Sequence, residues 1–466
     1  MYPDVDPPEF IPSPLRVGER LHPRVIGGRY RRARRVLAGV LIGLFLAAPW
    51  VHVGGHPVFL FHWLARRFVV FGVPFFPQDF HLVAIGLVTF VVFVSVFTVL
   101  FGRVWCGWAC PQTVFLEFVF RPVEAFFDGS PNARRRLDAA PWGTEKLLRR
   151  AAKHLVFLLL AGGVGLTGLA YVVGRETAGA TLRHPAEDLG SLVALVAFSV
   201  IFYAVFAHLR EVACVVICPY GRLQSVLTDR QTLTVAYDDR RGEPRGKIRR
   251  DTAGGTSGDC VDCLLCVQVC PTGIDIRNGT NQLECVGCTA CIDACDSVMD
   301  KLARPRGLIR YASPGGIGRA ARREVPRRIT GRVMAYGLVL LALLGGLGTL
   351  LLTRRPVEAT LLRAPGQLYQ RQPDGDWSNL YTLELTNKTF QANTYEVRAR
   401  TPGVAVRPVG PPLRAAGGAR VRGTLFLSVP AQRATGTPQP VELAILTEGR
   451  VIDRVRTTLL TPFPNR

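Results

Sequence analysis

Two neighbouring segments decide the fold of this 466-residue chain: Cys260-Val-Asp-Cys263-Leu-Leu-Cys266-Val-Gln-Val-Cys270-Pro271 and Cys285-Val-Gly-Cys288-Thr-Ala-Cys291-Ile-Asp-Ala-Cys295. They hold eight of the twelve cysteines. Three cysteines at Cys-x2-Cys-x2-Cys spacing wrap one corner of a [4Fe–4S] cluster, and the fourth ligates the neighbouring cluster. We therefore expect a bacterial ferredoxin-type region with two [4Fe–4S] clusters, one held by Cys260, Cys263, Cys266 and Cys295 and the other by Cys285, Cys288, Cys291 and Cys270.

Two other uses of clustered cysteines fit this pattern poorly. A zinc module usually shows two pairs of ligands rather than a doubled run of four. A disulfide framework needs an oxidising compartment, which nothing in the flanking sequence indicates. One departure from the ferredoxin pattern is Asp296, which stands where the second motif usually carries proline. That proline shapes the turn and does not ligate iron, so the prediction of two clusters stands.

The composition indicates a membrane protein. Hydrophobic residues make up 48% of the chain although its formal net charge is +22. This combination is natural where the charge is concentrated in loops on one side of a bilayer. A nucleic-acid-binding protein could also be this basic, but the basic residues flank apolar runs and no binding signature is present. We therefore expect no nucleic-acid partner.

Five apolar runs predict membrane-spanning helices, at residues 36–53, 82–101, 155–173, 189–209 and 333–352. The resulting domains are a basic cytoplasmic arm (1–35), a four-helix membrane region (36–232), the ferredoxin region (233–332), the fifth helix (333–352) and a tail (357–466). Low apolar content makes the arm a disordered or surface-lying segment. Residues 54–80, which mix aromatic residues, arginine and proline, suit an interfacial segment.

The distribution of Lys and Arg predicts the orientation. The arm carries eight, the 54–80 loop two, the 102–153 loop nine, the 174–188 loop two and the 210–332 region twenty. Positively charged loops stay in the cytoplasm. The arm and the ferredoxin region are therefore predicted to be cytoplasmic and the tail periplasmic, in a multi-pass protein of the bacterial inner membrane.

The tail has the pattern of a β-sandwich. Runs such as 381–385, 394–399 and 421–427 alternate apolar and polar residues, as half-buried strands do. Turn signals such as Pro373-Asp374-Gly375 separate them. About 110 residues of short strands favour an immunoglobulin-like fold. Because the tail contains no cysteine, we interpret it as a docking or positioning module.

The four remaining cysteines form a second repeat, Cys106-Gly-Trp-Ala-Cys110-Pro111 and Cys214-Val-Val-Ile-Cys218-Pro219. Each element follows a span that runs into the cytoplasm. On a continuing helix, cysteines at i and i+4 share one face, and the proline would kink or end the helix. Four such thiolates suit Cu(I), zinc or an iron–sulfur centre. A redox-active dithiol is a further interpretation.

Other candidate residues carry less weight. The histidines at positions 52, 56, 62, 81, 154 and 208 are expected to be polar boundary residues, with His208 the first to test as a ligand because it lies six residues before Cys214. Trp105 and Trp108 are expected in an interfacial aromatic belt, and Arg103 is expected to be an ordinary positive-inside anchor.

The whole pattern resembles the FixG/CcoG family of cytochrome c oxidase accessory proteins. The resemblance rests on the two Cys-x3-Cys-Pro elements, the doubled ferredoxin motif, the single following span and a sandwich-like tail that includes Trp377–Tyr381 and Asn387–Thr389. It implies that the protein is a metalloreductase that reduces Cu(II) to Cu(I) during assembly of cbb3-type oxidase, with a copper transporter or chaperone as partner. Cys106, Cys110, Cys214 and Cys218 would then bind copper or pass electrons to it.

Two alternatives remain open at this point. The chain could be a quinol-linked subunit that feeds a respiratory reductase, since relatives in nitrate and nitrous-oxide respiration share the membrane cysteine elements and the ferredoxin motifs. It could also be a non-catalytic assembly scaffold. The sequence holds no nucleotide-binding fingerprint, so the electron donor must be another protein or a membrane quinol.

Overall fold

The computed structural model describes residues 21–54, 56–62, 67–76, 79–246, 258–279, 282–313, 330–366 and 368–463. The first twenty residues of the predicted basic arm lie outside this range. The chain divides into two compact units, one of residues 1–50 and 87–344 and the other of residues 51–86 and 345–466. This division does not test the predicted domain boundaries, which remain predictions.

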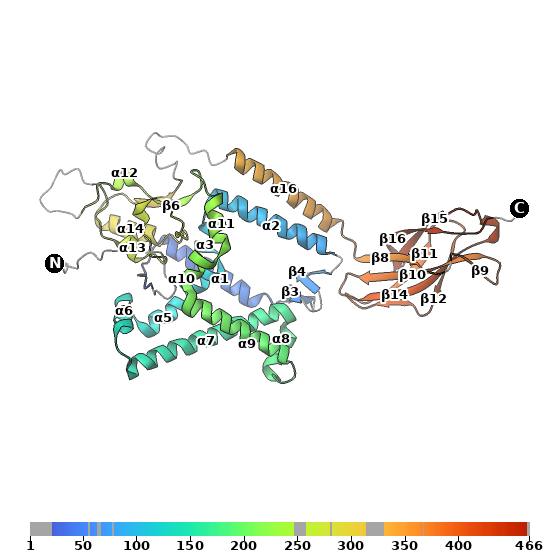
Figure 1. The fold of residues 1–466 in the computed structure, drawn as a ribbon, viewed down its shortest axis with the longest axis horizontal. Helices are drawn as coiled ribbons and strands as arrows, with labels where there is room; N and C mark the ends of the chain where they lie inside the picture. Colours follow the sequence, from blue (N-terminus) through green and yellow to red (C-terminus); the bar gives the residue numbers. More distant parts are fainter. Residues whose placement is uncertain are drawn as a thin grey trace. The chain divides into compact units, whose positions relative to one another are not determined.

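Four helical stretches in the described residues are long and apolar enough to cross a membrane. They are α2 (Phe80–Phe101), α7 (Thr144–Val173), the stretch Leu189–Gly221 that begins with α9 (Leu189–Ala204), and α16 (Gly331–Leu352). Figure 1 labels all of them. They correspond to four of the five predicted spans, although α7 begins at Thr144 rather than at residue 155 because a charged, helix-favouring segment precedes its apolar part.

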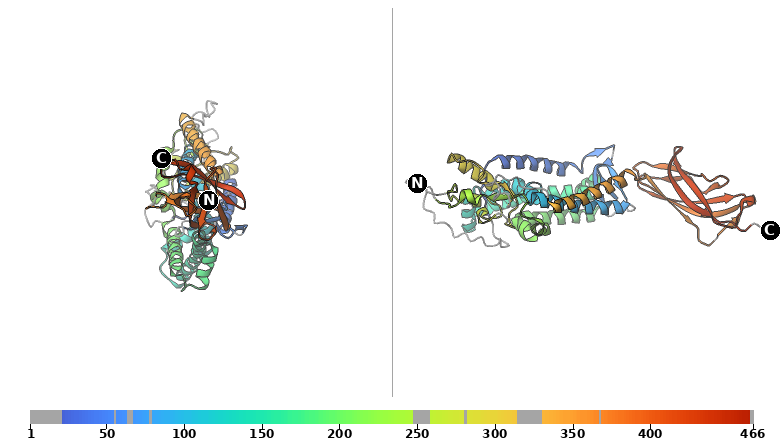
Figure 2. Two further views of the ribbon diagram at one scale, coloured as in Figure 1. Left: turned by 90° about the vertical axis from the view of Figure 1, so that its right-hand side faces the viewer. Right: turned by 90° about the horizontal axis from the view of Figure 1, so that it is seen from above.

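The first predicted span, residues 36–53, differs from the structure. The helix there is α1 (Arg29–Ala47), which begins among the arginines and ends just before Pro49. Proline at position 49 has no backbone N–H and its ring would clash with the carbonyl four residues earlier, so the helical hydrogen bonding ends there and does not reach residue 53. Figure 2 shows α1, in blue, running lengthwise beside other helices of its unit. The number of spans therefore stays a prediction.

Close packing between α7 and α9 organises the helical unit. Gly165 faces Ser199 and Gly168 faces the ring of Phe198, so the absence of side chains lets the two helices approach. Beside them, the rings of Phe120 and Phe206 stack at 4.7 Å between centroids. They belong to a buried cluster with Phe115, Leu116, Phe157, Val164 and Ala207.

Short helices connect the long ones and carry the cysteines. After α2 come α3 (Val104–Trp108), α4 (Pro111–Phe115), a π-helical turn (Leu116–Phe120), α5 (Arg121–Asp128) and α6 (Pro131–Ala139). Helix α8 (Arg175–Arg183) joins α7 to α9. After α9 come π-helical turns at Val205–Leu209 and Ala213–Ile217, which flank α10 (Arg210–Val212), and then α11 (Pro219–Leu227).

The ferredoxin region is built from short elements around a small apolar core. It contains β6 (Thr234–Tyr237), α12 (Asp239–Gly242), α13 (Leu265–Gln268), a 3-10 turn (Ile276–Asn278), α14 (Ala290–Lys301) and β7 (Ile309–Ala312). Strands β6 and β7 pair antiparallel. The buried core includes Val235, Ile274, Ile276, Ile292, Met299 and Ile309, and several cysteines pack against it.

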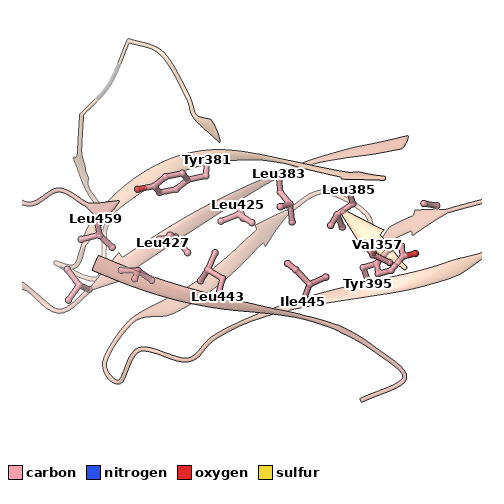
Figure 3. Close-up of a cluster of buried hydrophobic side chains, with 13 residues drawn as sticks. Val357, Tyr381, Leu383, Leu385, Tyr395, Leu425, Leu427, Leu443, Ile445 and Leu459 are labelled. Atoms are coloured by element: carbon pink, nitrogen blue, oxygen red, sulfur yellow. The ribbon is translucent and has the colours of Figure 1, made fainter. Parts of the chain in front are cut away.

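The C-terminal part of the second unit is a two-sheet sandwich, as the alternation in the sequence predicted. One sheet has the order β12-β14-β10-β8, with β9 also paired to β10, and the other has the order β13-β11-β15-β16. The strands are β8 (Val357–Arg363), β9 (Gln370–Arg371), β10 (Trp377–Asn387), β11 (Asn393–Ala399), β12 (Ala405–Val409), β13 (Leu413–Ala415), β14 (Arg420–Val429), β15 (Gln439–Thr447) and β16 (Arg450–Leu459). A 3-10 turn (Ala431–Arg433) follows β14. Figure 3 shows the leucines of β10, β14 and β15 meeting between the sheets.

Residues 51–86 contribute short strands to the second unit, where an interfacial segment was predicted. Strands β3 (Phe59–His62), β4 (Arg67–Val70) and β5 (Val73–Phe75) form one sheet, and β1 (His52–Val53) pairs with β2 (His56–Pro57). Asp79, just before α2, is buried and accepts hydrogen bonds from Arg354 at 2.6 Å and Lys388 at 2.7 Å. The start of α2 is thereby tied to the segment that follows α16.

Candidate functional site

The two ferredoxin motifs share one backbone device. Asp262 and Leu264, on either side of Cys263, have φ of 50° and 55°. Gly287 and Thr289, on either side of Cys288, have φ of 68° and 61°. Left-handed residues are uncommon outside glycine, so their recurrence at equivalent positions marks a tight loop that the fold imposes twice. Such a loop turns the middle cysteine of each run towards its neighbours.

The eight cysteines line two cavities. Cys260, Cys263, Cys266 and Cys295 line one cavity, here called site 1. Cys270, Cys285, Cys288 and Cys291 line another, here called site 2, to whose wall Cys266 also contributes. Each site holds one of the two sets of four that the ferredoxin spacing predicts, since the fourth cysteine of each run joins the other run. The remaining walls are largely apolar, which fits four thiolates around a [4Fe–4S] cluster.

The Cys-x3-Cys-Pro elements each contain a break between two helices. Cys110 and Cys218 both have extended backbones, with φ and ψ of −62° and 127° and of −68° and 113°. Each directly precedes a proline that starts the next helix. The predicted ending of the helix at proline is confirmed, because proline fits the first helical position. The expectation that each pair lies on one continuing helix is wrong.

The structure brings the two elements together. The side chain of Gln224, on α11, donates to Cys106 Sγ at 3.5 Å. Arg103 donates to the carbonyl of Gly221, so this residue links the elements and is more than the predicted positive-inside anchor. The thiol of Cys106 interacts electrostatically with those of Cys110 and Cys218. Cys214 interacts electrostatically with the other three, so the four partly buried cysteines lie near one another rather than as two distant pairs. No three of these cysteines, all within the described residues, have the spacing of a site for one metal ion.

Burial keeps the thiols of the first element protonated. It raises the pKa of Cys106 to about 11, against the opposing hydrogen bond from Gln224, and it also raises the pKa of Cys110. Thiols with a raised pKa are weaker nucleophiles at neutral pH, and the redox-active dithiol stays an alternative interpretation. A bound cation would instead draw off the protons, because a coordinating thiol is deprotonated by the metal.

The first cysteine element packs directly against site 2. A Cβ atom on Gly107 would lie 2.6 Å from the carbonyl oxygen of Gly287, closer than real Cβ atoms approach. The indole N–H of Trp108 donates to the Tyr311 hydroxyl at 3.0 Å, and that hydroxyl donates to the Gly287 carbonyl at 3.3 Å. Trp108 therefore belongs to this contact and not to the aromatic belt predicted for it. We call the contact of Gly107 with Gly287 and Cys288 the junction.

A buried network of charges joins the segment that follows the first cysteine element to the segment that precedes the second. Arg121 pairs with Glu117 and with Glu211, and Arg210 donates to both oxygens of Glu124 at 2.7 and 3.1 Å. All five side chains are buried. The π-helical turns beside them are a feature that often accompanies functional sites. The sequence showed these residues only as loop charges, so the network was not predicted.

The candidate histidines show other contacts. The Tyr203 hydroxyl lies 2.9 Å from Nδ1 of His154, and the His208 ring lies edge-on to the same tyrosine. His56 stacks on Phe390. Within the described ranges, no group of three or more His, Cys, Asp or Glu side chains has the spacing of a single-ion metal site. The idea that His208 joins the cysteines as a ligand stays untested.

Every segment that contains cysteine matches a family of 4Fe-4S domains. Residues 209–314 match the family described as a 4Fe-4S dicluster domain, and residues 83–130 match a 4Fe-4S binding domain. Residues 347–462 match the "IG-like fold at C-terminal of FixG". Residues 83–130 contain Cys106 and Cys110, and residues 209–314 contain the other ten cysteines.

Three curated proteins are similar over long stretches. Protein RdxB of Cereibacter sphaeroides is 35% identical over 397 residues, covering 81% of each chain. Protein RdxA of the same organism is 35% identical over 430 residues, covering 89% of this chain and 87% of its own. The nitrogen fixation protein FixG of Rhizobium meliloti is 38% identical over 315 residues, covering 63% of this chain and 57% of its own.

Proposed function

Because this chain belongs to the FixG family and is a membrane-associated iron–sulfur electron-transfer protein, we propose that it reduces Cu(II) to Cu(I) for the assembly of cbb3-type cytochrome c oxidase. Site 1 and site 2 are the two [4Fe–4S] sites, with the cysteine ligands given above. Cys106, Cys110, Cys214 and Cys218 receive copper, which is the substrate. A copper transporter or chaperone takes up the product.

The junction is the observation that supports this function most strongly. It places the backbone of Cys288, a site 2 residue, against Gly107, which lies between Cys106 and Cys110. When bound, the clusters supply single electrons at low potential. One electron from a reduced cluster would convert one Cu(II) into Cu(I), and that cluster would be oxidised by one electron until the external donor reduces it again. The four thiols release their protons as copper binds, and soft thiolate ligands then favour Cu(I).

The proposed orientation places the arm, the cysteine elements and the ferredoxin region in the cytoplasm and the sandwich in the periplasm. Two contacts support it. Arg34, near the start of α1, meets Gly107 just beyond α2, whereas the Phe45 carbonyl near its end accepts from Tyr171, near the end of α7. A helix of 19 residues is about 28 Å long, close to the thickness of a bilayer core. We therefore propose α1 as the fifth span.

The bond between Asp79 and Arg354 supports the same topology. Asp79 precedes α2 and Arg354 follows α16, so these two helix ends lie at one membrane face. That requires an even number of crossings between them, which α2, α7, the Leu189–Gly221 stretch and α16 supply. The sandwich then emerges on the side where α2 begins. We propose that it docks a partner of the oxidase assembly pathway.

The decisive experiment separates the four membrane cysteines from the clusters. A variant with Cys106, Cys110, Cys214 and Cys218 changed to serine is purified in detergent, and its iron content and visible spectrum are compared with those of the parent. Both proteins are reduced with dithionite, the excess is removed, and Cu(II) is added with a Cu(I)-specific chelator. The proposal expects loss of Cu(I) formation in the variant. Equal Cu(I) formation by variant and parent, with equal cluster content, would refute it.

A second candidate for the four cysteines is a further iron–sulfur cluster. The match of residues 83–130 to a 4Fe-4S binding domain favours it. Iron analysis of the anaerobically purified protein separates the two, because two clusters give about eight iron atoms per chain and three give about twelve. In the second case the chain would be an electron-transfer subunit, and reduction by a quinol would be the assay to follow. A scaffold role would require oxidase assembly to survive the loss of cluster redox activity.

A further inference from the structure

The most informative residue at the junction is Arg34. Its guanidinium is almost entirely buried, with 3% of the residue exposed. Nε donates to the Gly107 carbonyl at 2.8 Å, and Nη1 donates to the Cys288 carbonyl at 2.9 Å. One side chain thus bridges the first cysteine element and site 2, which are 181 residues apart in the sequence (288 − 107). The ring of Phe118 lies 5.5 Å from the guanidinium and covers it.

The start of α1 is fixed in a way that holds Arg34 in place. Asp293, on α14, accepts hydrogen bonds from the backbone N–H groups of Tyr30 at 3.2 Å and Arg31 at 2.8 Å. These are among the helix donors that have no intrahelical partner, and a carboxylate there interacts favourably with the helix dipole. The carboxylate of Asp293 is thereby held at the helix start, where it offsets part of the charge of Arg34 without forming an ion pair with it.

Charge is distributed differently around the two cysteine sites. Arg34 makes its two bonds to neutral carbonyls, and in the described residues no carboxylate lies within ion-pair distance of it. At site 1 the cation is Arg277, and it is paired with Asp275 at 2.6 Å and with Asp262 at 2.5 Å. Arginine stays protonated, so site 2 has a buried positive charge beside it, whereas the cation of site 1 is outweighed by two carboxylates.

Asp296 adds to this difference. It follows Cys295, a site 1 residue, and is 7% exposed. One oxygen accepts from the backbone N–H of Gly307 at 3.0 Å, and Arg29 lies 3.7 Å from the other. The position that carries proline in other ferredoxin motifs thus places a buried carboxylate next to site 1. Negative charge near a cluster opposes its reduction, and positive charge favours it, because reduction adds an electron.

We propose that Arg34 is a positioning residue that makes site 2 the electron exit, by holding it against the first cysteine element and raising its reduction potential above that of site 1. This inference rests on the proposed function. With both clusters bound, an electron would be held less favourably at site 1, beside its carboxylates, than at site 2, where Gly107 and Cys288 meet. Asp296 acts in the same direction by lowering the potential of site 1.

The test is a redox titration of the purified, cluster-loaded full chain, followed by electron paramagnetic resonance. The two potentials are first assigned with Cys263→Ser and Cys285→Ser, which remove a ligand from site 1 and site 2. Arg34→Gln is expected to lower the site 2 potential by about 59 mV, which corresponds to a tenfold change in a one-electron equilibrium. Asp296→Asn is expected to raise the site 1 potential. Arg34→Lys separates position from charge: it keeps the cation but cannot donate to both carbonyls in the same way.

Each outcome has a defined meaning. The proposal expects Arg34→Lys to retain the parent site 2 potential while slowing oxidation of the reduced protein by Cu(II). Equal potentials for the parent and Arg34→Gln, or an equal shift at both sites, would overturn it. If Arg34→Gln does not accumulate, two variants still test the proposal. An unchanged site 1 potential in Asp296→Asn, or unchanged oxidation by Cu(II) in Arg34→Lys, would contradict it. The potentials are measured without copper, so this test remains valid even if the protein does not reduce copper. Failure of the copper-reduction proposal would be seen separately, as absence of Cu(I) formation by the parent protein.

Discussion

The substitution Gly107→Ala tests the junction most directly. Its Cβ would lie 2.6 Å from the oxygen and 2.7 Å from the carbon of the Gly287 carbonyl, and 2.8 Å from the Cys288 nitrogen. All three are backbone atoms, which cannot rotate away as the end of a flexible side chain can. An ordinary carbon contact needs about 3.5 Å, so the two segments must separate by almost 1 Å.

The energetic cost can be bounded from two opposing effects. Overpacking a close contact costs about 1–3 kcal/mol. Replacing glycine by alanine inside a helix stabilises the folded state by about 0.5–1 kcal/mol, and Gly107 lies inside α3. We therefore expect a net destabilisation of about 0–2.5 kcal/mol if the junction holds. If it opens instead, the hydrogen bonds from Arg34 are lost and the backbone around Cys288 loses protection.

Hydrogen–deuterium exchange of the loaded protein measures both results. The peptide that contains residues 285–291 is expected to exchange faster in Gly107→Ala, and oxidation of the reduced protein by Cu(II) is expected to slow. The matched control is Gly162→Ala on α7, because a Cβ there meets nothing within 4 Å. That variant should match the parent in exchange at residues 285–291 and in copper reduction, and it should show only the small gain in stability that glycine to alanine gives inside a helix. Unchanged exchange at 285–291, unchanged thermal stability and unchanged copper reduction in Gly107→Ala would refute the existence of the junction.

Four further predictions address other parts of the molecule. Cys285→Ser should lower the iron content by up to one cluster, measured as iron per chain, and an undiminished content would contradict its assignment as a ligand. Arg210→Met should destabilise the helical unit by about 3–5 kcal/mol, because it leaves the buried carboxylate of Glu124 without its main partner, whereas an unchanged melting temperature would argue against the network. Burial alone would raise the pKa of Asp79, but hydrogen bonds from its two cationic partners hold that pKa below the ordinary value. Its contribution to stability is therefore complete above the unfolded pKa, near 4, and is lost as the pH falls through the folded pKa, so the stability difference between the parent and Asp79→Asn should disappear in acid. Leu427→Ala should destabilise the sandwich by about 2–5 kcal/mol in thermal unfolding, since this side chain is completely buried between the two sheets.

Most of the secondary structure could be predicted because its signals are local. The apolar runs identify α2, α7, α9 and α16, and the strands predicted at 381–385, 394–399 and 421–427 fall within β10, β11 and β14. Longer-range pairing was harder to predict. The interfacial location expected for residues 54–80 stays a prediction, and the structure adds short antiparallel strands there, whose pairing could not be inferred from periodicity alone.

The junction could not be predicted for the same reason. Arg34 belongs to a run of arginines that any positive-inside loop could carry, and its partners Gly107 and Cys288 are 73 and 254 residues away. The glycines at positions 107 and 287 indicate a close backbone contact only once the structure shows that the two segments meet. A search for glycines inside cysteine motifs could have suggested a close contact, but not between which segments.

The sequence by itself determined the chemistry of this protein. Ligand spacing within a loop and hydrophobic length within a helix depend on a few covalently linked residues, so the eight proposed cluster ligands and several long apolar helices could be predicted without knowledge of the fold. Tertiary structure decided which of these parts meet. It gathers the four remaining cysteines into one group, brings site 2 rather than site 1 to them, and places the unpaired charge of Arg34 between the two. Such choices depend on packing between segments far apart in the chain, where the free energy of burial, and not the order of residues, sets the neighbours.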